Sequence, residues 1–219
     1  MTLAIFDLDN TLLEGDSDYL WGRFMVEHRL VEPAAFDAAN RQFFRDYEAG
    51  TLDIHAYLRF ALEPLTRRSI AELEAWRARF LQEVIRPIIL PAGRERIRAH
   101  ARQGHATMII SATNAFITAP IAGLLEVDHL LATRPERQGD RYTGNYVGTP
   151  TFREGKVRAL REWLSDSHLT LEGSWFYSDS HNDRPLLEQV DNPVAVDPDP
   201  ELQRLAEERH WPILSFRDR

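Results

Sequence analysis

The sequence predicts an α/β fold in which a parallel sheet carries helices on both of its faces. Short apolar runs recur along the chain, and each is followed by polar residues, as in the buried strands of parallel sheets. Segments with helical periodicity separate the later runs, which is the pattern of consecutive right-handed βαβ units. A long stretch after the first run contains only helical patterns, and it predicts an all-helical insertion.

The apolar runs and the helical segments give the expected elements of the core. The predicted strands are residues 3–8, 107–110, 174–177 and 193–196. The predicted helices are residues 91–102, 116–125, 156–164, 184–190 and 200–208. Because parallel strands end at the same edge of a sheet, the polar residues that follow them are expected to meet there, where open α/β sheets bind ligands.

The helical insertion covers residues 16–86 and predicts roughly four helices. Its helix starts carry capping signals, namely Asp16-Ser17, Glu32-Pro33 and residues 51–53. We therefore expect an α/β catalytic core of residues 1–14 and 89–219 and a helical cap domain of residues 15–88. An insertion directly after the first strand is well placed to form a lid over the strand ends.

Residues 133–150 predict a small antiparallel flap. Gly139-Asp140 is a turn signal between two short polar segments, and Tyr142 and Val147 favour extended chain.

Composition and charge narrow the class of protein. The chain has 219 residues with 34 acidic and 26 basic side chains, a net charge of −8, which argues against a nucleic-acid partner. No apolar run approaches the ~20 residues that span a bilayer, so no membrane association is expected. The absence of cysteine excludes a thiolate nucleophile or metal site. Cytoplasmic residence is the default expectation, and the sequence does not indicate an oligomeric state.

Two carboxylates, Asp7 and Asp9, stand at the end of the first predicted strand. A carboxylate nucleophile needs a cation beside it, and a second carboxylate can protonate a leaving oxygen and later activate water. The alternative interpretation is a strand that simply enters a turn, where Asp and Asn are common.

Two more carboxylates, Asp179 and Asp183, follow the strand over residues 174–177. Mg²⁺ prefers oxygen ligands and usually takes one or two carboxylates, with water and phosphate completing its shell. Capping of the next helix by Asp179 or Ser180 is the alternative, but it does not account for four acids at two matched strand ends.

Ser111 and Lys156 are candidates for holding a phosphate group. Ser111 ends a predicted strand ahead of a helix, where a hydroxyl and backbone N–H groups can bind an anion; the alternative is a simple N-cap. Lys156 opposes the dipole at the probable start of a helix, which a bound phosphate would explain, whereas the alternative is a solvated surface lysine.

These four segments, in this order, resemble the four motifs of the haloacid dehalogenase superfamily of phosphohydrolases, whose core is Rossmann-like. The resemblance covers nearly the whole chain, and the helical insertion is similar to the cap of subfamily I. The likeness is to subfamily IB, with phosphoserine phosphatase-like and histidinol-phosphate phosphatase-like enzymes. Residues 177–183 and 195–199 resemble the latter group. Two departures concern loop shape: Ser178-Asp179-Ser180 replaces a common Gly-Asp-Gly, and Ala112-Thr113 replaces glycines.

The resemblance implies a phosphoric monoester hydrolase that works through an aspartyl-phosphate. Asp7 would be the nucleophile, and Asp9 the general acid and base, with its backbone carbonyl touching the metal. The implied Mg²⁺-binding set is Asp7, Asp9, Asp179 and Asp183. The implied phosphate- and substrate-binding set is Asn10, Asp16, Ser111, Ala112, Lys156 and Asn182.

The expected substrate is a small phosphorylated metabolite, with histidinol phosphate ahead of phosphoserine. Family members often carry an acid just past the first motif that faces the substrate's amino group; Asp16 is the better candidate and Asp18 the second, and the alternative for Asp16 is a helix cap. Phosphoserine would also need a cation for its carboxylate, for which Arg23 and Arg59 are candidates. Aromatic cap residues could wall an imidazole pocket or form the cap core: Trp21, Phe24, Phe43, Phe44 and Tyr47.

Two points stay open at this stage. His181 has no assigned role. An alternative function of a different class is a phospho-accepting module of receiver type, although Asp9 and the long insertion speak against it.

Overall fold

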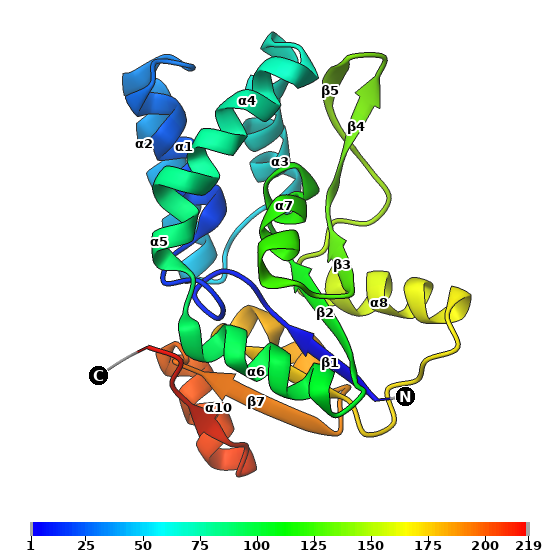
Figure 1. Cartoon of the computed structure of the whole chain (residues 1–219). Coiled ribbons are helices and arrows are strands. Elements are labelled where there is room, and N and C mark those ends of the chain that lie inside the picture. Colours follow the sequence, from blue (N-terminus) through cyan, green and yellow to red (C-terminus); the bar gives the residue numbers. More distant parts are fainter. Residues whose placement is uncertain (1, 218–219) are drawn as a thin grey trace.

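The computed structural model describes residues 2–217 and has the predicted α/β fold (Figure 1). A six-stranded parallel sheet has the order β3-β2-β1-β6-β7-β8. Its strands are β1 (Leu3–Phe6), β2 (Ala106–Ser111), β3 (His129–Ala132), β6 (Trp175–Ser178), β7 (Asn192–Val196) and β8 (Ile213–Leu214). The four predicted strands are confirmed, and the sheet gains β3 and β8 at its edges.

Helices cover both faces of the sheet, as predicted. They are α6 (Pro91–Arg102), α7 (Ala115–Leu125), α8 (Glu154–Asp166), α9 (Arg184–Leu187) and α10 (Pro200–Arg209). Side chains alternate along β1, so that Ala4 and Phe6 pack in one apolar cluster with α6 and α7, while Leu3 and Ile5 pack in another with α8, α9 and α10. Helix α9 is shorter than the predicted 184–190, because the chain turns there into β7.

The insertion is helical and lies above the sheet in Figure 1; we call residues 15–88 the cap. It contains α1 (Ser17–Glu27), α2 (Pro33–Glu48), α3 (Ile54–Leu62), α4 (Ile70–Phe80) and α5 (Arg86–Ile88), with a 3₁₀ turn at Glu63–Arg67 and a π turn at Leu81–Ile85. The three predicted capping signals are confirmed, since the side chains of Asp16, Glu32 and Asp53 accept backbone N–H bonds at the starts of α1, α2 and α3. No helix within residues 2–217 is both long and apolar enough to cross a membrane.

The chain enters and leaves the cap at one place. Glu14 N donates to Ile88 O at 2.7 Å, and Leu90 N donates to Leu12 O at 3.0 Å. Aromatic packing then joins the cap to the core, with the Trp21 and Phe116 ring centroids 5.6 Å apart. The paired crossing supports the boundaries at residues 14 and 89 that we propose for the two parts.

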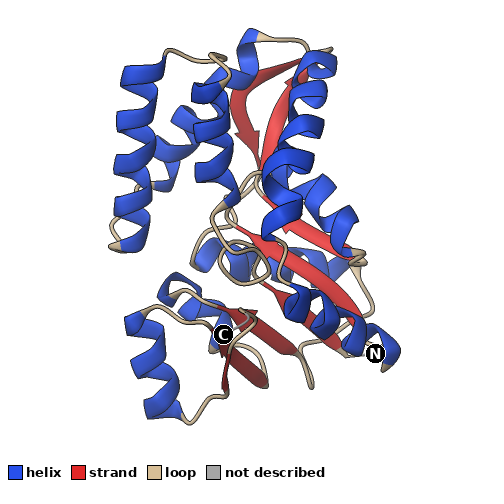
Figure 2. Cartoon of the chain, turned by 60° about the vertical axis from the view of Figure 1, so that its left-hand side comes forward, coloured by secondary structure: helices blue, strands red, loops and turns tan. Residues whose placement is uncertain are grey.

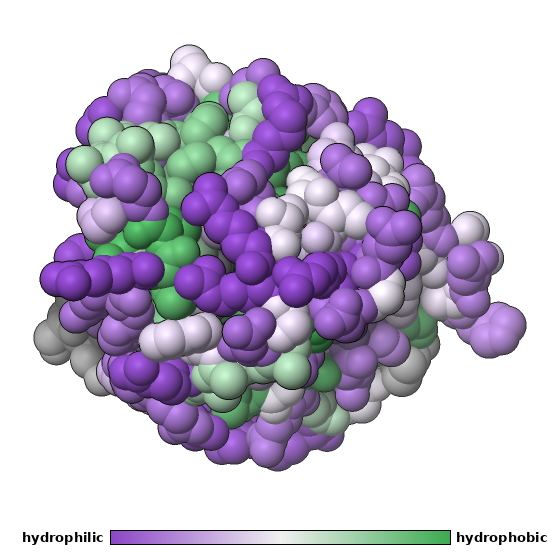
Figure 3. Space-filling view, turned by 90° about the horizontal axis from the view of Figure 1, so that it is seen from above, coloured by the Kyte–Doolittle hydropathy of each residue, from purple (hydrophilic) through white to green (hydrophobic). Residues whose placement is uncertain are grey.

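The predicted flap is an antiparallel hairpin of β4 (Arg134–Gln138) and β5 (Arg141–Val147). Gly139 makes the turn with φ +61°, a conformation that favours glycine. The hairpin lies beside the cap helices (Figure 2), and Ile70 N donates to Asp140 O at 2.9 Å. Seen from the cap end, the surface is largely hydrophilic, with hydrophobic residues showing in several places between the polar ones (Figure 3).

Candidate active site

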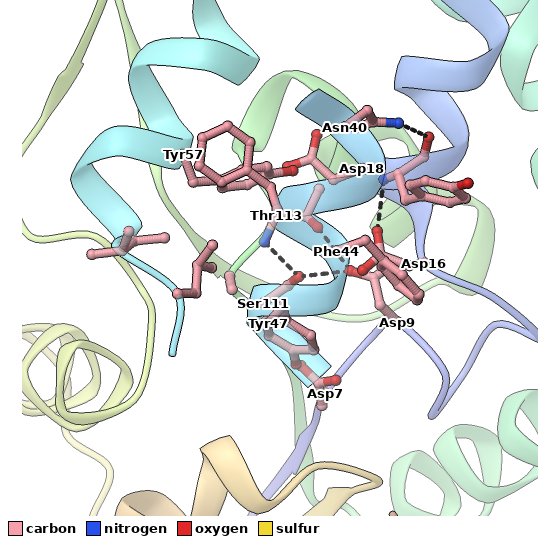
Figure 4. Close-up of a pocket in the computed structure, with 15 residues that line it drawn as sticks. Asp7, Asp9, Asp16, Asp18, Asn40, Phe44, Tyr47, Tyr57, Ser111 and Thr113 are labelled. Atoms are coloured by element: carbon pink, nitrogen blue, oxygen red, sulfur yellow. Dashed lines mark hydrogen bonds between the residues drawn. The ribbon is translucent and has the colours of Figure 1, made fainter. Parts of the chain in front are cut away.

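A cavity lies where the cap meets the carboxyl ends of β1 and β2 (Figure 4). The core contributes Asp7, Asp9, Ser111, Ala112 and Thr113, and the cap contributes Asp16, Asp18, Asn40, Tyr47 and Tyr57. Its free volume is about 40 Å³, which is room for a few water molecules. Little free space therefore remains between the cap and the core in this structure.

Lys156 joins the first and last motifs at the floor of the site. Its Nζ donates to Asp7 Oδ1 and to Asp183 Oδ2, both at 2.7 Å, and its side chain is only 3% exposed. Ser178 Oγ also donates to Asp183 Oδ2, at 2.7 Å. Lys156 is the single lysine of the chain, beside 25 arginines. Its ammonium is a compact point charge, and here it donates to two carboxylates at once.

Asp9 is held from two sides. Its Oδ1 accepts the Ser17 backbone N–H at 2.7 Å, at the start of α1. Its Oδ2 accepts the Thr113 hydroxyl at 2.8 Å and, at 3.4 Å, the Ser111 hydroxyl. Asp9 thus bridges the cap and the end of β2, with its carboxylate fixed beside the cavity.

Asp179 is tied to the first motif by Thr11. The Thr11 hydroxyl donates to Asp179 Oδ1 at 2.9 Å, and it accepts the Asp179 backbone N–H at 3.0 Å. Residues that are 168 positions apart in the sequence are thereby held together.

Negative charge is concentrated in this site. Burial raises the pKa of Asp7 to about 7 even though Lys156 opposes the rise. Burial also raises the pKa of Asp9, and burial with the Asp7 charge raises the pKa of Asp179 well above its usual range. For Lys156, burial disfavours the charged form, but Asp183 and Asp7 outweigh it and raise the pKa. One ammonium faces several buried carboxylates, which is an environment that favours a further cation.

The carboxylates are not arranged as a ready-made three-ligand cluster: within residues 2–217, no three His, Cys, Asp or Glu side chains form a group that could hold a metal ion. A cation there would take one or two carboxylates and complete its shell with backbone carbonyl, water or phosphate oxygens, which is the usual arrangement for Mg²⁺.

Asp16 and Asp18 both line the cavity. Asp16 accepts the Tyr19 backbone N–H at 2.7 Å, so it caps α1 and also faces the pocket. Asp18 is 7% exposed, and Asp18 Oδ2 has no hydrogen-bond partner in the described part of the chain. Burial raises the pKa of Asp18 to about 7, although a hydrogen bond from Tyr57 opposes this.

Several predicted site residues do not line this cavity, and Lys156, Asp179 and Asp183 are among them. Asn10 adopts φ +57° in the turn after β1, and its N–H donates to Gly15 O. The Asn182 amide is bonded to Arg153 and to the Tyr47 carbonyl. Arg59 is exposed on α3 and Arg23 lines a separate hollow between α1 and α2. Neither arginine is placed to meet a substrate carboxylate in this cavity.

Sequence reasoning did not assign roles to Thr11, Thr113, Asn40, Tyr57 or Arg153. Thr11 stands inside the first motif, and Thr113 directly follows the second, so their positions were a usable signal. The occurrence of Lys156 as the only lysine in the sequence was another usable signal. Asn40 packs against Gly22, where an added Cβ would lie 2.6 Å from its amide nitrogen, and no local pattern reveals that contact.

Comparisons with known proteins identify the family of the chain. A family model described as haloacid dehalogenase-like hydrolase matches residues 4–188. A histidinol-phosphatase of Neisseria meningitidis is 46% identical, with 98% of this chain and 99% of that protein covered. A phosphoserine phosphatase of Mycobacterium tuberculosis, SerB1, is 34% identical, with 98% and 70% covered. A solved structure of a protein of unknown function from Bordetella pertussis is 42% identical, with a TM-score of 0.93 and 99% and 100% coverage.

The receiver-type alternative does not agree with these relatives or with the helical lid. The family match spans most of the sequence, and the similar curated proteins carry phosphatase names over almost the full length of this chain. The chain belongs to the haloacid dehalogenase-like hydrolases and is a phosphoric monoester hydrolase of the phosphoserine phosphatase-like type.

Proposed function

We propose that this protein is a Mg²⁺-dependent phosphomonoesterase that uses Asp7 as its nucleophile and histidinol phosphate as its substrate. The observation that carries the proposal is the buried Lys156 ammonium, 2.7 Å from Asp7 and from Asp183, beside a cavity that Asp9 also lines. Phosphoryl transfer asks an enzyme mainly for positioning and for neutralisation of charge, and this arrangement supplies both.

The proposed reaction has two steps. A carboxylate oxygen of Asp7 forms a bond to phosphorus while the bond from phosphorus to the ester oxygen breaks, and Asp9 gives its proton to the departing alkoxide. Asp9, now ionised, takes a proton from water as that water attacks the aspartyl-phosphate. Inorganic phosphate leaves, and Asp7 is restored as a carboxylate. The raised pKa of Asp9, caused mainly by burial, suits a group that must begin the cycle protonated.

The residues that would hold Mg²⁺ are Asp7, Asp179 and the backbone carbonyl of Asp9. Asp183 would act on this set indirectly, because its carboxylate is already bonded to Lys156 and Ser178. The bound ion would supply positive charge that lets an anionic nucleophile meet a dianionic phosphate. The raised pKa of Asp179, caused by burial and then by Asp7, supports this site because a dication would offset both effects.

The cap side of the cavity supports a substrate with a cationic group and no carboxylate. Asp16 and Asp18 provide negative charge there, and aromatic side chains form the wall: Tyr19, Phe43, Phe44, Tyr47 and Tyr57. Among the described residues that line the cavity, none is Lys or Arg. Histidinol phosphate carries an ammonium and an imidazole, whereas the carboxylate of phosphoserine would find no cationic partner on this wall.

The test is a side-by-side assay of kcat/KM for histidinol phosphate and phosphoserine, with Mg²⁺ and with excess chelator. We expect Mg²⁺-dependent turnover of both, with histidinol phosphate preferred by on the order of 100-fold or more, as when a buried polar group loses its partner. A preference for phosphoserine would contradict the proposal that histidinol phosphate is the substrate. Undiminished activity in chelator would contradict the proposed Mg²⁺ dependence.

A further inference from the structure

The core holds the C-terminal end of cap helix α2 through two side chains from two separate loops. Asn182 Nδ2 donates to Tyr47 O at 3.1 Å, and Arg153 Nη2 donates to Gly50 O. Arg153 Nε also donates to Asn182 Oδ1 at 2.9 Å, which links the two donors to each other. The last carbonyls of a helix have no partner within the helix, and cationic groups are favoured beside them. Tyr47 O also accepts the Gly50 backbone N–H at 3.0 Å, so the core adds a second bond there and a further bond at Gly50 O, just beyond the helix.

The approach at Gly50 leaves no room for a side chain. Gly50 has φ +65°, and an added Cβ would lie 2.8 Å from His181 Nε2 and 3.0 Å from Arg153 Nη2. The His181 ring is itself fixed, because its Nδ1 and its backbone nitrogen each lie 2.7 Å from Asp199 Oδ2. His181, which had no role from sequence, therefore forms one wall of the contact between core and cap.

Arg153 adopts an uncommon backbone conformation, with φ +50° and ψ −122°. Non-glycine residues rarely occupy positive φ, and such strain persists where the surroundings fix the residue. Its guanidinium lies 5.1 Å from the centre of the Phe152 ring and bonds to both Asn182 and Gly50. The strained residue directly precedes α8, whose first turn carries Lys156.

The held helix end places Tyr47 in the active site. Tyr47 lines the cavity with Asp7 (Figure 4), and burial, followed by the Asp179 and Asp7 charges, raises its pKa well above the usual range. Its phenol therefore stays protonated and can only donate to a negative group beside it. The same turn of α2 thus presents its carbonyl to the core and its side chain to the reacting carboxylate.

We propose that Arg153 is a positioning residue that ties the end of α2 to the loop of Asn182 and so sets the place of Tyr47 over Asp7. The activity assay that tests this role of Arg153 rests on the proposed function. The guanidinium bonds join the core to the cap, so their loss weakens the hold of the cap on a substrate that the cap must grip, and a small ester that needs little from the cap is affected less.

The first experiment compares Arg153→Gln with Arg161→Gln, an exposed arginine on α8 that bonds Gln189. We expect Arg153→Gln to lower kcat/KM for histidinol phosphate on the order of 10–100-fold, while p-nitrophenyl phosphate changes by about twofold or less. Arg161→Gln should leave both unchanged, and Arg153→Lys should recover only part of the loss. Equal losses on both substrates in Arg153→Gln would overturn the positioning role.

The second experiment does not depend on activity. The Cβ added by Gly50→Ala should push the end of α2 away from Arg153 and His181. Gly104→Ala is the control: Gly104 also has a positive φ, +76°, but an added Cβ would have nothing within 4 Å, so this variant carries backbone strain without a clash. Hydrogen exchange of the amides of residues 49–51 should be about tenfold faster or more in Arg153→Gln and Gly50→Ala, and unchanged in Gly104→Ala. Unchanged exchange in both variants would overturn the proposal even if the phosphatase assay succeeds, and faster exchange would support it even if that assay fails.

Discussion

Lys156 Nζ lies 2.7 Å from Asp7 Oδ1, and both side chains are almost completely buried. Asp7 directly follows β1, and Lys156 lies in the first turn of α8, 149 positions later. Removal of either charge would leave the other without its partner in a region of low polarity, which is costly. The pair therefore both stabilises the fold and keeps the proposed nucleophile in place.

Replacement of Lys156 by methionine should destabilise the protein in a way that depends on pH. Asp7 and Asp183 would lose their buried cation, and in metal-free buffer at pH 7 we expect a loss of about 3–5 kcal/mol in the free energy of unfolding. Without the ammonium, the folded-state pKa of Asp7 would lie even further above the unfolded value of 3.8. The folded variant then binds protons more tightly than the unfolded chain, so its stability rises as pH falls from about 7 toward 5.

Urea unfolding of Lys156→Met at pH 7 and pH 5 measures this, with the exposed Arg158→Met on the same helix as control. Wild-type Asp7, with a pKa of about 7, also takes up protons over this range, so both proteins should gain stability toward pH 5 and the variant should gain more. A loss of the same size at both pH values would contradict the account.

Replacement of Asp9 by asparagine should separate the two chemical steps. p-Nitrophenolate leaves without help from an acid, but the alkoxide of histidinol phosphate does not. We expect histidinol phosphate turnover to fall about 10²–10⁴-fold. p-Nitrophenyl phosphate should keep a rapid first turnover, followed by slow steady-state release, because water activation also needs Asp9. Stopped-flow absorbance with substrate in excess over enzyme records the burst, and its absence with a uniformly slow first turnover would argue against Asp9 as the acid and base.

Replacement of Asp18 by asparagine should change the pH dependence of substrate binding. Burial raises the pKa of Asp18 to about 7. The fraction of Asp18 that is ionised and can bind a cation therefore increases as pH rises from 6 to 8. The ratio of KM for histidinol phosphate between variant and wild type should therefore increase with pH. It should reach about tenfold or more at pH 8, in line with a hydrogen bond to a charged group.

The control for Asp18→Asn is p-nitrophenyl phosphate, which carries no cation. Its KM ratio should stay near one at every pH, and a KM ratio for histidinol phosphate that does not vary with pH would remove Asp18 from substrate recognition.

Replacement of Gly155 by alanine should disturb Lys156. A Cβ at Gly155 would lie 1.9 Å from the Pro150 carbonyl oxygen, so α8 must move away from the loop that precedes it. We expect a loss of about 1–3 kcal/mol or more in stability together with a loss of activity. Gly123→Ala on α7, with nothing within 4 Å, is the matched change. Thermal unfolding and kcat measured on both would show the contrast, and two variants of equal stability and activity would contradict it.

The sequence was sufficient for elements whose signals are local. Pro91 and the helical pattern behind it gave α6 its observed bounds, and the capping side chains of Asp16 and Asp53 gave the starts of α1 and α3. The strands β3 and β8 were not predicted. β3 is a short edge strand with all four residues half-buried, and β8 has only two residues, so each gave only a weak strand signal.

The residues of the candidate site also divide into those that local signals predict and those that only the folded chain brings together. Asp7, Asp9, Ser111 and Asp179 could be named because each follows a strand whose end the topology brings to one edge of the sheet. Contacts between distant segments could not be foreseen: Arg153 meets Gly50 across 103 positions, and Asn182 turns its amide to the cap. The exclusion of Arg23 and Arg59 from the cavity also depends on helix rotation, which an amphipathic pattern leaves loosely defined.

The most direct test of the whole account is where phosphorus becomes attached. The Asp9→Asn variant, mixed with p-nitrophenyl phosphate and Mg²⁺ and quenched in acid, should carry one phosphoryl group on the peptide that contains Asp7, as read by mass spectrometry. The double variant with Asp7→Asn should carry none. A phosphoryl group on another residue, or full turnover by Asp7→Asn alone, would contradict the central claim.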